Sequence, residues 1–240
     1  APEVLKFFMS IGVPLFEAYG MTENCAYATS NSPENIKIGT VGIPAHGVEL
    51  KLADDGEILI RSGGVFKGYF KDDQATSETI DKDGWLHTGD VGIYEGDFVK
   101  IIDRKRDIII TSGGKNVSPS EIENKIKVSP FIKEAIVIGD RRKFLSVLIG
   151  IEFDTVSNWA LRKNIPHTTY RDLSEKQEVK DLVWKEISKA NELTSSLEVR
   201  EFRMIPKELD HEEGELTATQ KVKRNVLIDQ FSDLIEEMYS

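Results

Sequence analysis

The sequence is poor in cysteine, since Cys25 is alone among its 240 residues. A single cysteine cannot form a disulfide within the chain, and this fits a reducing compartment such as the cytoplasm. No histidine lies near Cys25 in the sequence, so a small apolar role for this side chain is favoured over a nucleophile. The four histidines also lack the spacing of zinc ligands; they are His46, His87, His167 and His211.

Positive charge is scarce as well, because 31 Lys and Arg stand against 41 Asp and Glu and give a net charge of −10. This balance disfavours a general nucleic-acid-binding protein, which needs a basic face, and leaves open a local basic site for a nucleotide. No apolar run approaches the roughly 20 residues that cross a bilayer, and no stretch has the pattern of a signal peptide. With 40% hydrophobic and 30% charged residues, the composition is typical of a globular protein.

The chain opens inside a predicted helix and without an initiator methionine, so we expect an N-terminal portion to be missing. The apolar face of this helix is made by Val4, Phe7, Phe8 and Ile11. The apolar run 13–19 predicts a buried strand. Residues 48–52 and 57–61 flank the turn 54–56, which contains Gly56, and together they predict a β-hairpin.

Five charged residues in a row, 103–107, follow a predicted strand at 98–102 and mark the clearest domain boundary. Beyond it, a helix is predicted to begin with a capping box, in which Ser118 and Glu121 flank Pro119. The other elements expected here are strands at 107–111, 133–139, 145–152 and 199–205, and helices at 154–163, from 174 and from 222. This mixture indicates a small α+β domain.

Six short stretches stand out, and their order matters more than any one of them. They are YGMTE (19–23), GEILIR followed by KGYF (56–70), GWLHTGD (84–90), DRKR (103–106), SGGKNVSPSEIE (112–123) and TATQKVKR (217–224). Together they resemble the adenylate-forming superfamily, which holds acyl-CoA synthetases, firefly luciferase and the adenylation domains of peptide synthetases. The resemblance covers nearly the whole chain. It implies a mixed α/β and α+β fold, in which 1–103 form the end of the large AMP-binding domain with a β-rich subdomain, 104–106 the hinge and 107–240 the small mobile C-terminal domain.

The first stretch is a turn that would lie against AMP in such an enzyme. The resemblance implies that Tyr19 packs on adenine and that Gly20 and Met21 belong to the same AMP-binding turn. Thr22 would contact the α-phosphate and Glu23 would help to hold Mg²⁺. An aromatic face suits a purine, a hydroxyl can donate to a phosphate oxygen, and a hard carboxylate suits a hard cation. From these residues alone, a strand-ending turn with incidental polar side chains is an equal alternative.

The ribose and the hinge fall in the next two stretches. An aspartate after a glycine is most often a plain turn residue, but the resemblance implies that Asp90 accepts hydrogen bonds from both ribose hydroxyls and that Arg104 also contacts the ribose. Arg106 would stand at the pivot of the hinge, where many relatives have Asp or Lys. A solvated charged loop is the alternative reading, and it is compatible with a hinge, which has to be exposed and mobile.

The glycine pair Gly113 and Gly114 precedes Lys115 but is not a phosphate-binding P-loop. That pattern needs glycine at position 109 and Ser or Thr at position 116, where this chain has Ile109 and Asn116. Glycines can let a ligand approach the backbone closely. The resemblance places Gly113 and Gly114 beside the pantetheine tunnel for CoA.

Lys221 is the candidate catalytic residue. In isolation, a lysine at the predicted start of a helix is usually a solvated surface charge. In the resemblance it takes the position of the C-terminal lysine that reaches the bond forming between the carboxylate and the α-phosphate, where a compact cation suits the developing charge. Gln220 replaces a glycine common in relatives, a position that often varies in long-chain fatty acyl-CoA synthetases.

The resemblance is strongest to long-chain fatty acyl-CoA synthetases, because the segment between 152 and 217 is longer than in compact relatives. It implies a ligase that uses ATP, Mg²⁺ and CoA to convert a fatty acid first to acyl-AMP and then to a thioester, with domain rotation between the steps. The Ser/Thr/Gly-rich phosphate loop of the family is absent from these residues, so we expect the 240 residues alone to be inactive in adenylation.

Two alternatives remain open from the sequence. One is an acyl-AMP ligase or carrier-protein loader that does not use CoA, and the other is a standalone nucleotide-binding module without full activity. We expect small-molecule substrates, no nucleic acid, and a cytoplasmic location. The sequence leaves open a peripheral contact with a membrane and a homodimer.

Overall fold

The computed structural model describes residues 2–193 and 198–240. The chain forms two compact units, Ala1–Asp107 and Ile108–Ser240. The second domain was predicted to begin at residue 107, and the second unit begins one residue later, at Ile108.

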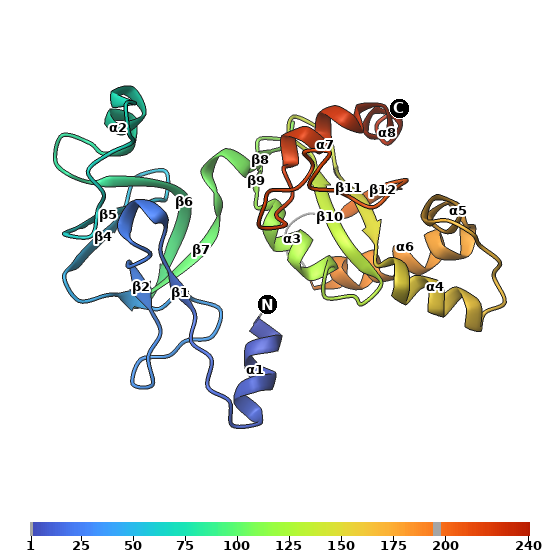
Figure 1. The fold of residues 1–240 in the computed structure, drawn as a ribbon, viewed down its shortest axis with the longest axis horizontal. Coiled ribbons are helices and arrows are strands. Elements are labelled where there is room, and N and C mark those ends of the chain that lie inside the picture. Colours follow the sequence, from blue (N-terminus) through green and yellow to red (C-terminus); the bar gives the residue numbers. More distant parts are fainter. Residues whose placement is uncertain (1, 194–197) are drawn as a thin grey trace. The chain divides into compact units, whose positions relative to one another are not determined.

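The first unit is rich in short antiparallel strands (Figure 1). Its elements are α1 (Pro2–Ser10), β1 (Ala18–Tyr19), the 3₁₀ turn η1 (Thr22–Asn24), β2 (Thr29–Ser30), β3 (Ile43–Pro44), β4 (Val48–Leu52), β5 (Glu57–Ser62), α2 (Asp73–Thr79), β6 (Leu86–Glu95), β7 (Phe98–Arg104) and the 3₁₀ turn η2 (Lys105–Asp107). One sheet has the order β4-β5-β6-β7 and a second has the order β1-β2-β3. A core between them is built around Ala28, Ile58, Ile60, Leu86 and Val99.

The predicted hairpin at 48–52 and 57–61 is confirmed by β4 and β5, which pair antiparallel from Val48 opposite Ser62 to Leu52 opposite Ile58. The turn needs Gly56, whose φ of +82° lies in the left-handed region that side chains disfavour. The N–H of Gly56 donates to the carbonyl of Ala53 at 2.9 Å and closes the turn. Local turn chemistry was therefore sufficient to predict this element.

The strand predicted at 13–19 is wrong for most of its length. Only Ala18 and Tyr19 form a strand, opposite Ser30 and Thr29, while Val13, Leu15 and Phe16 are exposed. A strand needs a neighbour to satisfy its backbone groups. No pairing of residues 13–17 with another strand occurs in the part of the chain that the structure describes.

Two further expectations in the first unit change. Asp90 does not lie in a turn, because it belongs to the ten-residue strand β6. The strand predicted at 98–102 is present but extends to Arg104, so two of the five charged residues lie in β7 and the last three form η2.

The second unit combines a three-stranded sheet with helices. Its elements are β8 (Ile109–Ile110), β9 (Asn116–Val117), α3 (Pro119–Ile126), β10 (Ile132–Ile138), β11 (Leu145–Ile151), α4 (Phe153–Arg162), α5 (Tyr170–Glu175), α6 (Gln177–Glu192), β12 (Val199–Met204), α7 (Arg224–Gln230) and α8 (Ser232–Glu237). β11 is central, antiparallel to β10 and parallel to β12, and β8 pairs with β9.

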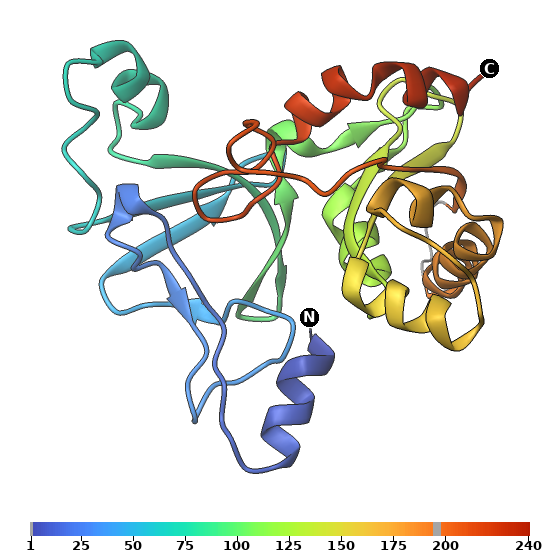
Figure 2. The same ribbon diagram turned by 45° about the vertical axis from the view of Figure 1, so that its right-hand side comes forward.

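Helices cover both faces of this sheet (Figures 1 and 2). On one face, Val147 and Ile149 of β11 belong to the larger core with residues of α3, α4, α5 and α6. On the other face, Leu148 joins residues of α7 and α8, among them Leu227 and Ile235. Every residue of β11 is buried, as expected for a central strand covered on both sides.

The predicted helix cap at 118–121 is confirmed, since the hydroxyl of Ser118 accepts a hydrogen bond from the N–H of Glu121 at 3.3 Å. The helix expected from 174 is α6, which begins at Gln177 because Lys176 has extended backbone; Ser174 belongs to the separate helix α5. The helix expected from 222 begins at Arg224, because Val222 forms an antiparallel bridge with Leu216. It is also interrupted, at Phe231, between α7 and α8.

Within the ranges 2–193 and 198–240, no helix has both the length and the apolar character that a membrane span requires.

Candidate functional site

Three predicted nucleotide-binding side chains meet at the carboxylate of Asp90. The hydroxyl of Tyr19 donates a hydrogen bond of 2.5 Å to Asp90 Oδ2. Arg104 Nε lies 3.8 Å from Asp90 Oδ1. The second contact follows from the sheet, because Asp90 on β6 stands directly opposite Arg104 on β7. The side chain of Asp90 is 17% exposed and that of Arg104 is 55% exposed, so a ligand can reach the guanidinium from solvent.

Tyr19 serves this cluster as a hydrogen-bond donor. Burial raises the pKa of Tyr19 well above its ordinary value, and the hydrogen bond to Asp90 and the charge of Asp90 raise it further. The phenol therefore stays protonated at neutral pH and keeps donating to the carboxylate. The family resemblance implies that the ring of Tyr19 packs on adenine, and that role remains a prediction.

The turn before this cluster has a tightly packed backbone. A Cβ on Gly20 would lie 2.2 Å from the carbonyl carbon of Ala26, so only glycine fits. Met21 donates its N–H to Asn24 Oδ1 at 2.9 Å and is half-buried. Thr22 is exposed at the start of η1. Its hydroxyl is therefore accessible to an incoming ligand.

Glu23 is held by two contacts to residues 66–69. The hydroxyl of Tyr69 donates to Glu23 Oε1 at 2.7 Å, and the N–H of Phe66 donates to the carbonyl of Glu23 at 2.7 Å. Tyr69 lies in the KGYF stretch, to which the sequence analysis gave no role. These contacts fix the carboxylate on the same turn as Tyr19 and Thr22.

The carboxylate of Glu57 was not predicted to belong to the site, yet it contacts two of the matched stretches. It accepts a hydrogen bond from the N–H of Gly89 at 2.9 Å and lies 3.0 Å from Lys105 Nζ. His87 Nδ1 is 3.3 Å from the same carboxylate, and His87 Nε2 is 3.7 Å from Asp81. The signal in the sequence was an acidic residue that directly follows a turn glycine and starts an apolar strand.

The predicted hinge follows β7 without a break. Arg106 lies in η2 and its side chain is 76% exposed, with Nε 3.9 Å from Asp107 Oδ1. An ion pair this exposed contributes little to stability. Arg106 is thus weakly held, whereas Lys105 beside it is paired with both Asp55 and Glu57.

Gly113 and Gly114 lie in the exposed turn between β8 and β9 of the second unit. Gly114 has a φ of +76°, and its N–H donates to the carbonyl of Thr111 at 2.9 Å. No heavy atom would lie within 4 Å of a Cβ on Gly114. Backbone conformation therefore explains this glycine, and its approach to a ligand remains a prediction.

Lys221 lies in a tight loop before α7. The N–H of Lys221 donates to Thr217 Oγ1 at 3.0 Å, and the N–H of Thr217 donates to the carbonyl of Lys221 at 2.8 Å. Gln220 has a φ of +59°, in the left-handed region, which explains why glycine suits this position. The side chain of Lys221 is exposed at this loop rather than on a helix.

Two ionic contacts fix the ends of this loop. At its start, the fully buried Glu215 pairs with Lys207 Nζ at 2.7 Å and accepts from the N–H of Asp210 at 2.8 Å. At its end, Arg224 donates to Glu123 Oε1 at 2.7 Å and to the carbonyl of Val137 at 3.0 Å. The contact of Arg224 with Glu123 joins the stretch 217–224, which contains Lys221, to the stretch 112–123, which contains Gly113 and Gly114.

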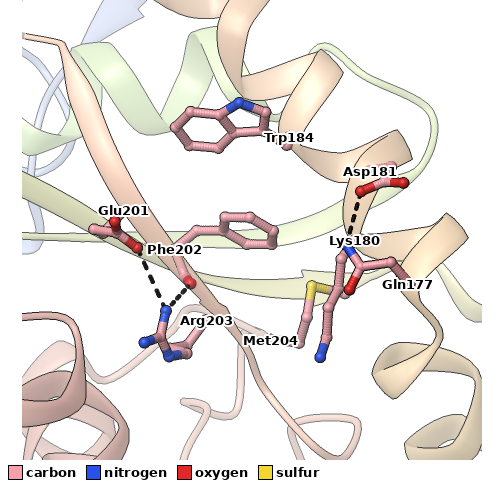
Figure 3. Close-up of a pocket in the computed structure, with 8 residues that line it drawn as sticks. All are labelled: Gln177, Lys180, Asp181, Trp184, Glu201, Phe202, Arg203 and Met204. Atoms are coloured by element: carbon pink, nitrogen blue, oxygen red, sulfur yellow. Dashed lines mark hydrogen bonds and ion pairs between the residues drawn. The ribbon is translucent and has the colours of Figure 1, made fainter.

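A separate cleft of about 350 Å³ lies between α6 and β12. Figure 3 shows the rings of Trp184 and Phe202 lying over one another, with centroids 5.7 Å apart. Lys180, Asp181 and Arg203 place charges of both signs at its rim. None of the site residues predicted from the sequence lines this cleft, so it is distinct from the candidate site.

In the part of the chain that the structure describes, no three His, Cys, Asp or Glu side chains gather into a group that could hold a metal ion. Glu23 can supply one hard carboxylate oxygen. This donor set fits a Mg²⁺ ion that takes its other ligands from nucleotide phosphates and water, which is the usual mode for this ion.

Comparison with known proteins places these features in a family. The family described as AMP-binding enzyme C-terminal domain matches residues 106–240, and the family described as AMP-binding enzyme matches residues 1–70. The chain is 38% identical to long-chain-fatty-acid–CoA ligase FadD15 of Mycobacterium bovis, over 98% of this chain and 39% of that protein. It is 35% identical to long-chain-fatty-acid–CoA ligase 6 of Homo sapiens, over 100% of this chain and 37% of that protein.

A solved structure extends the likeness to the fold. O-succinylbenzoate coenzyme A synthetase (MenE) from Bacillus subtilis, in complex with ATP and magnesium ion, is 27% identical, with a TM-score of 0.66 over 93% of this chain and 43% of that chain. This likeness confirms the mixed α/β and α+β fold class. The chain thus spans about two fifths of the length of these relatives. Because the first family match alone takes in more than half of its residues, the chain belongs to the AMP-binding enzyme family, and residues 106–240 are its C-terminal domain.

Proposed function

We propose that this chain is the ribose-binding, hinge and lysine-bearing part of a long-chain fatty acid–CoA ligase. The observation that carries the proposal is the meeting of Tyr19, Asp90 and Arg104 at one carboxylate, in the order that the family resemblance implies. The reaction begins when an oxygen of the fatty acid attacks the α-phosphorus of ATP, and pyrophosphate leaves to give acyl-AMP. The CoA thiol then attacks the acyl carbonyl, and AMP leaves.

Asp90 binds the ribose in this proposal. A carboxylate can accept one hydrogen bond on each oxygen from two neighbouring hydroxyls. Tyr19 already donates to Oδ2, and this bond fixes the orientation of the carboxylate before the nucleotide arrives. Arg104 would also contact the ribose, and its greater exposure supports an approach from the solvent side.

Glu23 would supply the single protein carboxylate for Mg²⁺. The ion, when bound, neutralises charge on the phosphates during the displacement. Tyr69 occupies one of the carboxylate oxygens, so we infer that the cation is held mainly through the nucleotide. Support for this assignment comes from the ATP and magnesium ion named for the Bacillus subtilis structure.

Lys221 would stabilise the negative charge that develops between the attacking carboxylate and the α-phosphate. Preorganised charge at such a position is often the largest contribution to catalysis. The loop contacts of Thr217 and the anchors at Glu215 and Arg224 support this role, because they hold the backbone of Lys221 in place. A lysine on a solvated surface would need no such fixing.

The hinge and the glycine turn would serve the second step. We infer that rotation about Arg106 removes Lys221 from the adenylate and brings Gly113 and Gly114 to the pantetheine of CoA. The weak hold on Arg106 supports a pivot there. A carrier protein in place of CoA is the alternative acceptor, and the names of the two ligases support CoA. A cytoplasmic location, a peripheral membrane contact and a homodimer remain proposals.

The test uses a polypeptide as long as the relatives, with fatty acids of graded chain length. Lys221→Ala should lower ATP–pyrophosphate exchange at least about 100-fold, the scale seen when one charge-stabilising group is removed. Lys223→Ala, an exposed neighbour two residues away, is the matched control and should keep activity near that of the unsubstituted enzyme.

Omitting CoA then separates the two acceptors. A ligase accumulates acyl-AMP without CoA and releases the thioester with it. Exchange that survives Lys221→Ala would refute the role of this lysine, and acyl-AMP that does not react with CoA would favour a carrier-protein loader.

A further inference from the structure

The buried carboxylate of Glu57 contacts three donors from two separate segments of the first unit. Glu57 begins β5 and is 5% exposed. Its Oε1 accepts from the N–H of Gly89 at 2.9 Å. Its Oε2 lies 3.0 Å from Lys105 Nζ and 3.3 Å from His87 Nδ1. One side chain is therefore bonded both to the segment of Asp90 and to the segment that leads into the hinge.

The contacts keep Glu57 charged despite its burial. Burial raises the pKa of Glu57, but hydrogen bonds from Lys105, Gly89 and His87 outweigh burial and hold the pKa below its ordinary value. Hydrogen bonds to Asp55 and Glu57 raise the pKa of Lys105. A buried charge that loses its partners retains a large desolvation cost. Glu57 thus depends on its donors to stay ionised inside the fold.

Two of the three donors, Gly89 and Lys105, are sequence neighbours of residues of the proposed site. Gly89 directly precedes Asp90 and has a φ of +70°, in the left-handed region. Lys105 directly follows Arg104, which stands opposite Asp90 in the sheet. A change at the carboxylate of Glu57 would accordingly reach the backbone on both sides of the Asp90–Arg104 pair.

We propose that Glu57 is a positioning residue, which holds Gly89 on the ribose side and Lys105 on the hinge side in one arrangement. The proposal rests on the proposed function for the meaning of Asp90 and the hinge. Because Gly89 and Lys105 use different oxygens of the carboxylate, their contributions are separable. Removing the charge of Lys105 should free the hinge side alone, whereas neutralising Glu57 should loosen both sides.

The experiment measures deuterium uptake and AMP affinity on the 240-residue chain. Peptides covering 86–91 and 104–107 report the two sides, and calorimetric titration with AMP reports the ribose site. The variants are Glu57→Gln, Lys105→Met and Lys105→Arg. Glu49→Gln is the matched control, because Glu49 pairs with Arg61 at 2.6 Å on the neighbouring strand but is exposed and outside the site.

Glu57→Gln should speed uptake at 86–91 and 104–107 and weaken AMP binding, each by about tenfold or more, the scale of a lost hydrogen bond to a charged group. Lys105→Met should speed uptake at 104–107 only, and Lys105→Arg should restore it, because arginine keeps the charge. Glu49→Gln should change neither region.

The proposal fails if Glu57→Gln behaves like Glu49→Gln, or if Lys105→Met leaves the uptake at 104–107 unchanged. If Glu57→Gln does not fold, the pair Lys105→Met and Lys105→Arg still decides the hinge side. If the unsubstituted chain does not bind AMP, the proposed nucleotide site is refuted, while deuterium uptake still decides whether Glu57 joins the two segments.

Discussion

Two buried glutamates show how single residues of this chain hold whole segments in place. Glu57 contacts the segments of Asp90 and Lys105, and Glu215 stands at the start of the loop of Lys221. Burial raises the pKa of each glutamate, yet lysine and backbone donors outweigh it and leave the pKa below its ordinary value. Both carboxylates are ionised at neutral pH, so they act as charged anchors within the fold.

Glu57 should therefore contribute stability that depends on pH. Its pKa is lower in the folded than in the unfolded chain, so the unfolded chain binds the proton more readily. The contribution is present above the ordinary glutamate pKa of about 4.3 and is lost as pH falls through the lower, folded value. We expect the unfolding free energy, measured by urea unfolding from about pH 3 to pH 7, to fall less toward acid pH in Glu57→Gln than in the unsubstituted chain.

The exposed Glu34 supplies the control for this series. Glu34→Gln should leave the fall of the unfolding free energy toward acid pH unchanged. If the unfolding free energy falls equally steeply toward acid pH with and without the carboxylate of Glu57, this group is not an ionised anchor.

Among the helices and strands, those determined by residues close together in the sequence could be predicted, and those determined by contacts with distant residues could not. The β4–β5 hairpin and the cap at Ser118 depend on residues within a few positions of each other. The strand assignment of Asp90 depends on pairing with Arg104, fourteen residues later in the chain by their numbering. The apolar residues that predicted a helix from 174 all lie within α6, so periodicity did not fix its first residue, which depends on the extended backbone of Lys176.

The loop of Lys221 illustrates an element whose shape depends on distant contacts. Arg224 donates to Val137 and Glu123, residues of β10 and α3 that are far away in sequence. Two of its nitrogens reach two different acceptors through a planar fork, and the single nitrogen of lysine does not have this fixed geometry.

Arg224→Lys should consequently lower the unfolding free energy of the second unit by about 1–3 kcal/mol, the range for a partner left without its charge-assisted hydrogen bond. Urea unfolding measures the change. Arg200→Lys, at an exposed position of β12, is the matched control and should stay within about 0.5 kcal/mol of the unsubstituted chain. Equal stabilities for the two variants would show that the Arg224 contacts do not secure the loop.

For the whole molecule, the candidate site is predicted by the order of the motifs rather than by any single residue. Asp90, Arg104 and Tyr19 were named from the resemblance, and the structure brings them to one point. Glu57 and Tyr69 were not named, because their roles arise from contacts that join residues 30 or more positions apart. Contacts of this kind are fixed by tertiary packing, which local pattern does not encode.

The last prediction concerns what the 240 residues can do by themselves. They contain the proposed ribose carboxylate and the proposed catalytic lysine but no Ser/Thr/Gly-rich phosphate loop. AMP should therefore bind through Asp90, and Asp90→Asn should weaken it by about tenfold or more. Asp97→Asn, in the exposed turn between β6 and β7, is the control and should not change the affinity.

ATP–pyrophosphate exchange by the 240 residues should be undetectable, because the β- and γ-phosphates lack a cradle of backbone donors. Exchange at the rate of a polypeptide as long as the relatives would show that these residues alone complete the adenylation site.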